Sequence, residues 1–352
     1  MAGVWHVLRR HYRLPTPADE RHQAPTVDGW LLALYRYRPR GSAAVPEPVI
    51  LCHGLLSNRF NVDLSEEASL ARHLRDEGFD VWVMELRGHG GSRRLRPGPA
   101  FDWTLDDYIQ RDLPAVVARV KQLTGAERVH WFGHSLGGML LYGACALPGM
   151  AEQFRSAVVC DAPAAFATLR RRTRLARAYA RCFRAVPPAL VLPFLGPAAW
   201  VAPSLLLRRH GVHERRLALS LLANAIIPWG SSRALDHIAR MLESGRFRSS
   251  DGAIDYEEGP AHIRFPLLVL SAARKLMDER AITAGYELCA AEQKACVRLT
   301  REAGCAEDYT HASIMVSPSA RVDVYPRVAA WLRTQGAAMR PEAERADQKV
   351  KV

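Results

Sequence analysis

Residues 129–141 read Val-His-Trp-Phe-Gly-His-Ser-Leu-Gly-Gly-Met-Leu-Leu, and this stretch decides the fold. The apolar segment before the glycines predicts a short strand, and the apolar run after them predicts a helix. Between the two lies the pattern Gly-x-Ser-x-Gly, with Ser135 at its centre. A serine on a tight strand-to-helix turn needs small neighbours because the two backbones approach each other closely there. The stretch therefore predicts a nucleophilic serine presented at the end of a strand.

Short apolar segments on both sides of this motif alternate with segments of helical spacing. Further strands are predicted at residues 49–52, 79–86, 158–160, 266–270 and 295–299, and helices at residues 66–77, 105–124 and 322–334. Such alternation predicts an α/β fold with a mostly parallel, doubly wound sheet, because parallel neighbours must be joined by crossover helices.

The alternation is interrupted after the strand that ends near Cys160. The stretch that follows is rich in helical spacing and prolines, and it predicts a helical cap inserted over the sheet. We expect a poorly ordered leader over residues 1–26 and a disordered tail over residues 335–352. The α/β core is expected over residues 27–162 and 251–334, and the cap over residues 163–250.

Two backbone N–H groups are predicted to form an oxyanion hole beside the serine. One belongs to Leu136, which follows the nucleophile at the start of a helix, and the other to Leu55, in the loop after an early strand. We expect His53 in the same loop to brace it. The general base is predicted to be His311, because it follows the last strand and the fold places its histidine after the nucleophile and the acid.

Several segments beyond the serine motif resemble the α/β-hydrolase superfamily. They are His53-Gly54-Leu55-Leu56, Gly78-Phe79-Asp80-Val81-Trp82, Arg87-Gly88, Leu105-Asp106-Asp107-Tyr108 and Gly133-His134-Ser135. Within the superfamily they are similar to the acid-lipase-like and bacterial lipase-esterase branch. The resemblance implies an α/β-hydrolase fold and an ester-type serine hydrolase, and it says little about the substrate.

The chain departs from that family at the position of the catalytic acid. Aligning the strand at residues 267–270 puts Lys275 where the acid is expected, and a lysine cannot accept the imidazole N–H. Asp161 is our first candidate, because some branches, pancreatic lipases among them, carry the acid at the end of the preceding strand. Asp278 is the alternative. Asp308 is near His311 in sequence but is expected to point elsewhere, and a dyad without an acid stays open.

Composition bounds the compartment and the partners. The net charge is +12, yet no zinc-finger spacing or ribonucleoprotein signature accompanies it, so we expect no nucleic-acid partner. Seven cysteines without paired spacing indicate a reducing cytosol, and residues 4–8 are too short and polar for a signal peptide. We therefore expect a cytoplasmic protein that can touch membranes peripherally.

The expected cap contains a basic stripe. Seven arginines lie between Arg170 and Arg184, and no charged residue occurs over residues 185–207. The stripe is either a solvated lid-helix face or a surface that contacts anionic membrane headgroups. In both cases an apolar cap over the serine favours a small hydrophobic ester substrate.

These observations predict a carboxylic ester hydrolase that forms an acyl-enzyme on Ser135, with His311 and Asp161 completing a catalytic triad. No metal and no organic cofactor is expected. The alternative is a non-catalytic hydrolase-fold protein that binds a lipid or a protein partner, which the lysine at position 275 would favour. A polyanion-binding protein is a third hypothesis, and it rests on charge alone.

Overall fold

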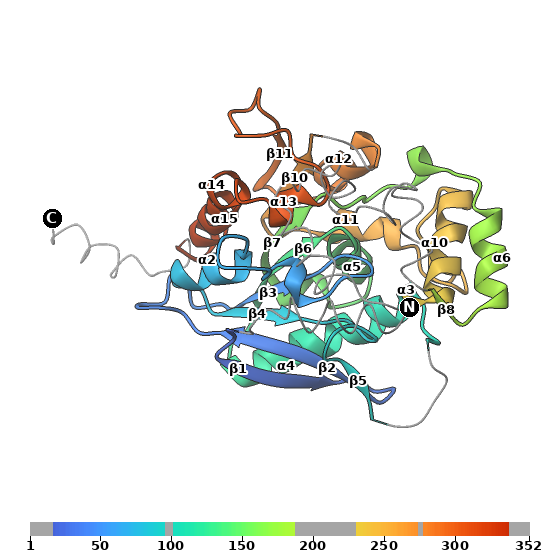
Figure 1. Ribbon diagram of the computed structural model, residues 1–352, viewed down its shortest axis with the longest axis horizontal. Coiled ribbons are helices and arrows are strands. Elements are labelled where there is room, and N and C mark those ends of the chain that lie inside the picture. The colour runs from blue at the N-terminus through green and yellow to red at the C-terminus, as the bar shows by residue number, and fades with distance from the viewer. Residues whose placement is uncertain (1–16, 96–100, 187–229, 274–276, 338–352) are drawn as a thin grey trace, which may run out of the picture.

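The computed structural model describes residues 17–95, 101–186, 230–273 and 277–337. In this part of the chain one nine-stranded sheet runs in the order β1-β2-β4-β3-β6-β7-β10-β11, and β5 pairs with β2 (Figure 1). All neighbours from β4 to β11 are parallel, while the pairs of β2 with β1, β4 and β5 are antiparallel. The strands are β1 (Glu20–Pro25), β2 (Trp30–Tyr37), β3 (Val49–Cys52), β4 (Val81–Met84), β5 (Arg93–Arg94), β6 (Val129–His134), β7 (Phe154–Cys160), β10 (Leu267–Ala272) and β11 (Lys294–Leu299).

Helices cover both faces of the sheet, as the predicted α/β-hydrolase fold requires. One apolar cluster joins the sheet to the helices that follow β4, β6 and β10, and the other joins it to α2 and the C-terminal helices. The first set is α3 (Leu105–Asp107), the π-helix η2 (Tyr108–Asp112), α4 (Leu113–Thr124), α5 (Leu136–Cys145) and α12 (Glu279–Leu288). Helix α11 (Gly259–His262) precedes β10 and packs against α5. The second is α2 (Leu70–Asp76), α13 (Ser313–Val316), α14 (Ala320–Asp323) and α15 (Tyr325–Ala337).

The chain leaves the sheet at Cys160 and returns to it at Leu267, which confirms the insertion after β7. Two helices of this insertion, α6 (Arg174–Cys182) and α10 (Ser232–Ser244), lie side by side at one end of the molecule (Figure 1). A short antiparallel pair, β8 (Ala185–Val186) with β9 (Gly230–Ser231), links their ends. Residues 187–229, which include much of the uncharged stretch, lie outside the described residues.

The predicted leader is wrong for residues 20–25, which form β1. This strand pairs along its whole length with β2, with Glu20 opposite Arg36 and Pro25 opposite Leu31. An edge strand needs few buried side chains, so its charged residues were read as a flexible leader. Strand β2 lies between β1 and β4 in the sheet. The C-terminal helix also continues to Ala337, three residues past the predicted border; residues 1–16 and 338–352 lie outside the described residues.

Candidate active site

Ser135 lies on the turn between β6 and α5 with φ 53° and ψ −115°, a left-handed backbone that a non-glycine residue rarely adopts. The turn is possible because its glycines have no side chain. A Cβ on Gly133 would lie 2.3 Å from the carbonyl oxygen of Gly137, and one on Gly137 would lie 2.6 Å from that of Cys52. The strain presents the serine hydroxyl at the carboxyl end of the sheet, as the motif predicts.

Three predicted residues meet at this edge of the sheet. The hydroxyl of Ser135 donates to Nε2 of His311 over 3.0 Å, and Nδ1–H of His311 donates to Oδ2 of Asp161 over 2.5 Å. Ser135 follows β6, Asp161 follows β7, and His311 lies in the loop between β11 and α13. The hydrogen bond to the carboxylate assigns the proton to Nδ1, which leaves the Nε2 lone pair free to accept the serine proton.

Asp161 is held for this contact by its backbone and by a second hydrogen bond. Its φ is 50°, it is 2% exposed, and its Oδ1 accepts the N–H of Ala272 at the end of β10 over 3.0 Å. Burial acts to raise the pKa of the carboxyl, but the hydrogen bond and charge of His311 and the Ala272 N–H outweigh burial, so the pKa is lowered. Asp161 is therefore an anion across the neutral pH range.

The other candidate acids have different partners. Oδ1 of Asp278 accepts the N–H of Arg280 over 2.9 Å and so caps the start of α12. Oδ1 of Asp308 accepts the N–H of Arg301 over 2.9 Å. Lys275 lies outside the described residues. The structure thus brings Asp161 to His311, whereas Asp278 and Asp308 accept hydrogen bonds from backbone N–H groups elsewhere.

The predicted oxyanion groups lie on either side of the serine. Leu136 is the first residue of α5, where backbone N–H groups are not used by the hydrogen bonds of the helix itself. Gly54 lies against the serine, since a Cβ there would be 3.3 Å from Cβ of Ser135. The next residue, Leu55, is 40% exposed. Both predicted donors therefore belong to segments that border the nucleophile, and the positive end of the α5 dipole favours negative charge at the same place.

His53 braces the loop, as predicted. Its Nδ1–H donates to the carbonyl of Gly54 over 2.8 Å, and its Nε2 accepts the N–H of Leu86 over 3.3 Å. Burial, aided by the neighbouring His89, lowers the pKa of His53 to about 3, so the ring is neutral at pH 7.

Two supporting side chains were not identified from the sequence. His134 donates Nε2–H to the main-chain carbonyl of His311 over 2.9 Å, which ties the nucleophile turn to the loop of the base. Oδ1 of Asn61 accepts the N–H of Gly54 over 3.2 Å and holds the loop beside the serine. His134 stands in the quoted motif, but its partner is 177 positions away, and only the fold brings the two together.

An apolar cavity of about 350 Å³ lies between the loop after β3 and the helices of the cap. Its lining residues are Leu55, Leu56, His89, Tyr108, Leu175, Ala176, Tyr179, Val186, Gly230, Ser231, Ala234, Leu235 and Ile238. One lining residue, Leu55, follows the Gly54 that packs on Ser135, so the cavity reaches the loop that borders the nucleophile. A larger, open cavity of about 580 Å³ lies at the opposite, amino end of β7 and β10, away from the serine.

Within the described parts of the chain, no three His, Cys, Asp or Glu side chains converge where they could hold a metal ion. The same residues contain no helix that is both long and apolar enough to cross a membrane.

Comparison with known proteins places these features in context. Residues 47–184 match a family model described as the alpha/beta hydrolase fold. Triacylglycerol lipase 2 of Arabidopsis thaliana is 34% identical over 152 residues, which are 40% of this chain and 36% of that protein. Gastric triacylglycerol lipase of Mus musculus is 35% identical over 129 residues, 34% of this chain and 33% of that protein. The chain thus spans about a third of the length of these relatives.

A solved thermophilic esterase from Thermogutta terrifontis superposes with a TM-score of 0.58 and 19% identity, covering 90% of this chain and 99% of the esterase. This likeness extends the fold assignment beyond the segment that matches the lipases. The predicted α/β-hydrolase fold is confirmed.

Proposed function

Because the chain has the α/β-hydrolase fold and is similar in sequence to lipases over part of its length, we propose that it is a serine hydrolase of carboxylic esters. The observation that carries the proposal is the continuous line of hydrogen bonds from Ser135 through His311 to Asp161. Its geometry is that of a nucleophile, a base and a group that orients the base. The lipase relatives support the same reaction class.

In the proposed mechanism, Oγ of Ser135 attacks the ester carbonyl while Nε2 of His311 takes its proton. The negative charge that develops on the carbonyl oxygen is stabilised by the N–H groups of Leu55 and Leu136. The protonated imidazole then gives its proton to the leaving alcohol, and the acyl group stays on the serine. Asp161 stabilises the imidazolium and holds its tautomer. Water, activated by the same histidine, releases the acid and restores the serine.

The substrate is proposed to carry a hydrophobic acyl or alkyl chain. The cavity beside the serine is lined by aliphatic and aromatic side chains, with no charged residue among those of the described chain that line it. Apolar walls bind apolar chains by removing both from water.

Hydrolysis of p-nitrophenyl esters from acetyl to dodecanoyl, with Ser135→Ala as the matched variant, tests this proposal. We expect wild-type turnover that Ser135→Ala lowers by about 10³-fold or more, and labelling of Ser135 by a fluorophosphonate probe. If wild type cleaves none of these esters and the probe does not label it, the chain is instead a non-catalytic hydrolase-fold protein that binds a lipid or protein partner.

We also propose that the protein contacts an anionic membrane surface peripherally, through the basic stripe on its cap. Arg177 forms ion pairs with Glu243 and Asp236, and Nε of Arg170 donates to a carbonyl of α10, so these two serve the cap itself. The other five arginines of the stripe are exposed and make no ion pair within the described chain: Arg171, Arg172, Arg174, Arg181 and Arg184. Helix α6 is shorter than the predicted stripe, so these residues lie before, on and after it.

Exposed apolar side chains lie in the same segment, since Leu175 is 88% and Phe183 is 55% exposed. Cations beside exposed apolar groups suit an anionic bilayer surface. Sedimentation with phosphatidylglycerol vesicles tests the contact. We expect binding that rises with the anionic lipid fraction and is lost in the triple variant Arg174→Gln/Arg181→Gln/Arg184→Gln. Equal binding to neutral vesicles would contradict the proposed contact.

The cysteines bear on the cellular location. All seven are free thiols, which supports the proposed cytoplasmic location.

A further inference from the structure

One residue that lines the apolar cavity, His89, carries a ring nitrogen without a hydrogen-bond partner among the described residues. His89, in the turn after β4, lines the cavity and is 1% exposed. Its Nε2 is buried and lacks a hydrogen-bond partner within the described parts of the chain. A buried polar atom without a partner destabilises the folded protein, so such an atom in the wall of a ligand cavity indicates a group on the ligand that pairs with it.

The chemistry of that pairing follows from the other ring nitrogen. Nδ1 of His89 lies 2.8 Å from the main-chain carbonyl of Arg87, and a carbonyl only accepts, so Nδ1 carries the proton. Burial lowers the pKa of His89 to about 4, so the ring is neutral at pH 7 and Nε2 is an unprotonated acceptor. A residue of the cavity wall therefore carries a free hydrogen-bond acceptor, and the ligand group that would match it is a donor.

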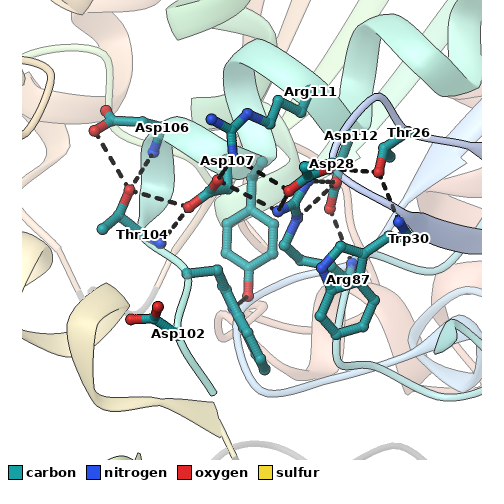
Figure 2. Close-up of polar contacts among 12 residues, drawn as sticks. Thr26, Asp28, Trp30, Arg87, Asp102, Thr104, Asp106, Asp107, Arg111 and Asp112 are labelled. Atoms are coloured by element: carbon teal, nitrogen blue, oxygen red, sulfur yellow. Dashed lines mark hydrogen bonds and ion pairs between the residues drawn. The ribbon is translucent and has the colours of Figure 1, made fainter. Parts of the chain in front are cut away.

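The ring is held in this orientation by the turn that carries it. The guanidinium of Arg87 lies among the carboxylates of Asp28, Asp107 and Asp112, at 2.6, 3.3 and 2.7 Å (Figure 2). These ion pairs fix the backbone whose carbonyl orients His89. On its other side the imidazole packs on His53, with ring centroids 5.0 Å apart. An acceptor that is positioned before binding gives selectivity without reorganisation of the wall.

Other polar groups in the cavity wall already have partners. The hydroxyl of Tyr179 donates to the carbonyl of Ala185 over 3.0 Å. Ser231 Oγ contacts the carbonyls of Phe101 and Trp103, and the indole N–H of Trp103 donates to the hydroxyl of Tyr108. The unpaired Nε2 of His89 is thus set apart in a wall that is otherwise apolar or satisfied.

We propose that this cavity selects an ester whose apolar chain bears a hydroxyl group, which donates its proton to Nε2 of His89. This inference rests on the proposed ester hydrolysis and names its substrate class. A cavity of about 350 Å³ lies near the lower end of the ~300–1,000 Å³ range of small-molecule sites. It suits one chain of medium length. The hydroxylated chain belongs either to the acyl group or to the alcohol.

Paired substrates that differ only in the hydroxyl test the proposal. On the acyl side, p-nitrophenyl decanoate is compared with hydroxydecanoates that carry the hydroxyl at successive carbons. On the alcohol side, decyl acetate is compared with the monoacetates of decanediols. We expect at least one hydroxylated ester to be preferred about tenfold in kcat/KM, the effect of one neutral hydrogen bond. The side on which the preference appears identifies the source of the chain.

Two cavity variants assign the preference to His89. The ratio of kcat/KM between the hydroxylated and plain esters is expected to fall to about one in His89→Phe. It is expected to stay at its wild-type value in Tyr179→Phe, because that hydroxyl already has a partner. Equal use of all pairs by wild type, or a preference that survives in His89→Phe, overturns the proposal.

Calorimetry on Ser135→Ala with methyl decanoate and its hydroxylated forms gives a readout that does not depend on turnover. Tighter binding of one hydroxylated ester by about tenfold supports the proposal, and equal binding overturns it. If wild type hydrolyses no ester, the proposed reaction fails, while this binding comparison still decides whether the cavity reads a hydroxyl.

Discussion

Nδ1 of His311 lies 2.5 Å from Oδ2 of Asp161, although the two residues are 150 positions apart in sequence. The carboxylate comes from the end of β7, one strand earlier than the strand on which the resembling lipases usually carry it. Because β7 lies between β6 and β10, its carboxyl end is close enough to the nucleophile turn for an aspartate there to reach the same imidazole.

Replacing Asp161 by asparagine is expected to lower kcat by about 10⁴-fold with a small change in KM, because the amide orients the imidazole in the wrong tautomer. The measurement is steady-state hydrolysis of p-nitrophenyl butyrate. Asp278→Asn is the matched control: it alters only the cap of α12, so kcat should stay within about twofold of wild type. A collapse of activity in the control and not in Asp161→Asn would reverse the assignment.

The sequence was sufficient to predict the elements that depend on local pattern. The glycines around Ser135 and the alternation of apolar segments predict the turn, the parallel sheet and the insertion after Cys160. The sequence could not decide whether Asp161 or Asp278 is the partner of His311, because the distance from either residue to His311 depends on the order of strands in the sheet. The sequence gives no signal for the role of His89, because which of its ring nitrogens finds a partner depends on the folded turn and on the rings of His53 and Tyr108 that pack against it. Strand β1 was missed because an edge strand carries charged side chains.

The buried ion pairs of Arg87 predict a large effect on stability. Its side chain is 2% exposed and faces three carboxylates, so Arg87→Met would leave Asp112 buried and unpaired. We expect the free energy of unfolding to fall by about 3–5 kcal/mol. Arg111 contacts two of the same carboxylates but is 45% exposed. Arg111→Met is therefore expected to lower the free energy of unfolding by less than about 1 kcal/mol. Urea denaturation of both variants measures the difference, and similar losses would argue against a central role for Arg87.

Acid pH is expected to destabilise the protein because several of its histidines are buried in the neutral form. Burial lowers the pKa of six histidines. It is lowered to about 3 for His53, His130 and His134 and to about 4 for His89, and the pKa values of His73 and His237 are lowered too. The unfolded chain binds protons below about pH 6.5 and the folded chain does not, so stability falls as the pH drops from 6.5 toward these lowered values. At pH 5 each of the four histidines whose pKa is about 3 or 4 is expected to lower the free energy of unfolding by about 2 kcal/mol.

Buried carboxyls oppose this trend, since burial also raises the pKa of Glu85 and of Glu257. Burial, only partly offset by Arg87, raises the pKa of Asp112 to about 6, and protonation of the folded state below that pH stabilises it by about 1 kcal/mol at pH 5. The histidines outweigh these carboxyls, so the urea midpoint should drop steeply between pH 7 and pH 5. His130 lies away from the proposed site and bonds to Ser156, and His130→Asn should make the pH dependence shallower. A midpoint that does not change over this range would contradict the assigned neutral state of the buried rings.

The cavity predicts how chain length affects turnover. Leu235 lines it from α10, and a tryptophan at this position would fill part of the space next to Ile238. Leu235→Trp is expected to lower kcat/KM for the decanoyl ester about tenfold more than for the acetyl ester, because only the longer chain must enter the cavity. The measurement is the kcat/KM series from acetyl to dodecanoyl. Val322→Trp adds the same ring to a side chain that is 76% exposed on α14, and it should leave the series unchanged. If Leu235→Trp lowered kcat/KM equally for esters of all chain lengths, the acyl chain would have to bind elsewhere. The cavity would then not be the subsite that selects the substrate.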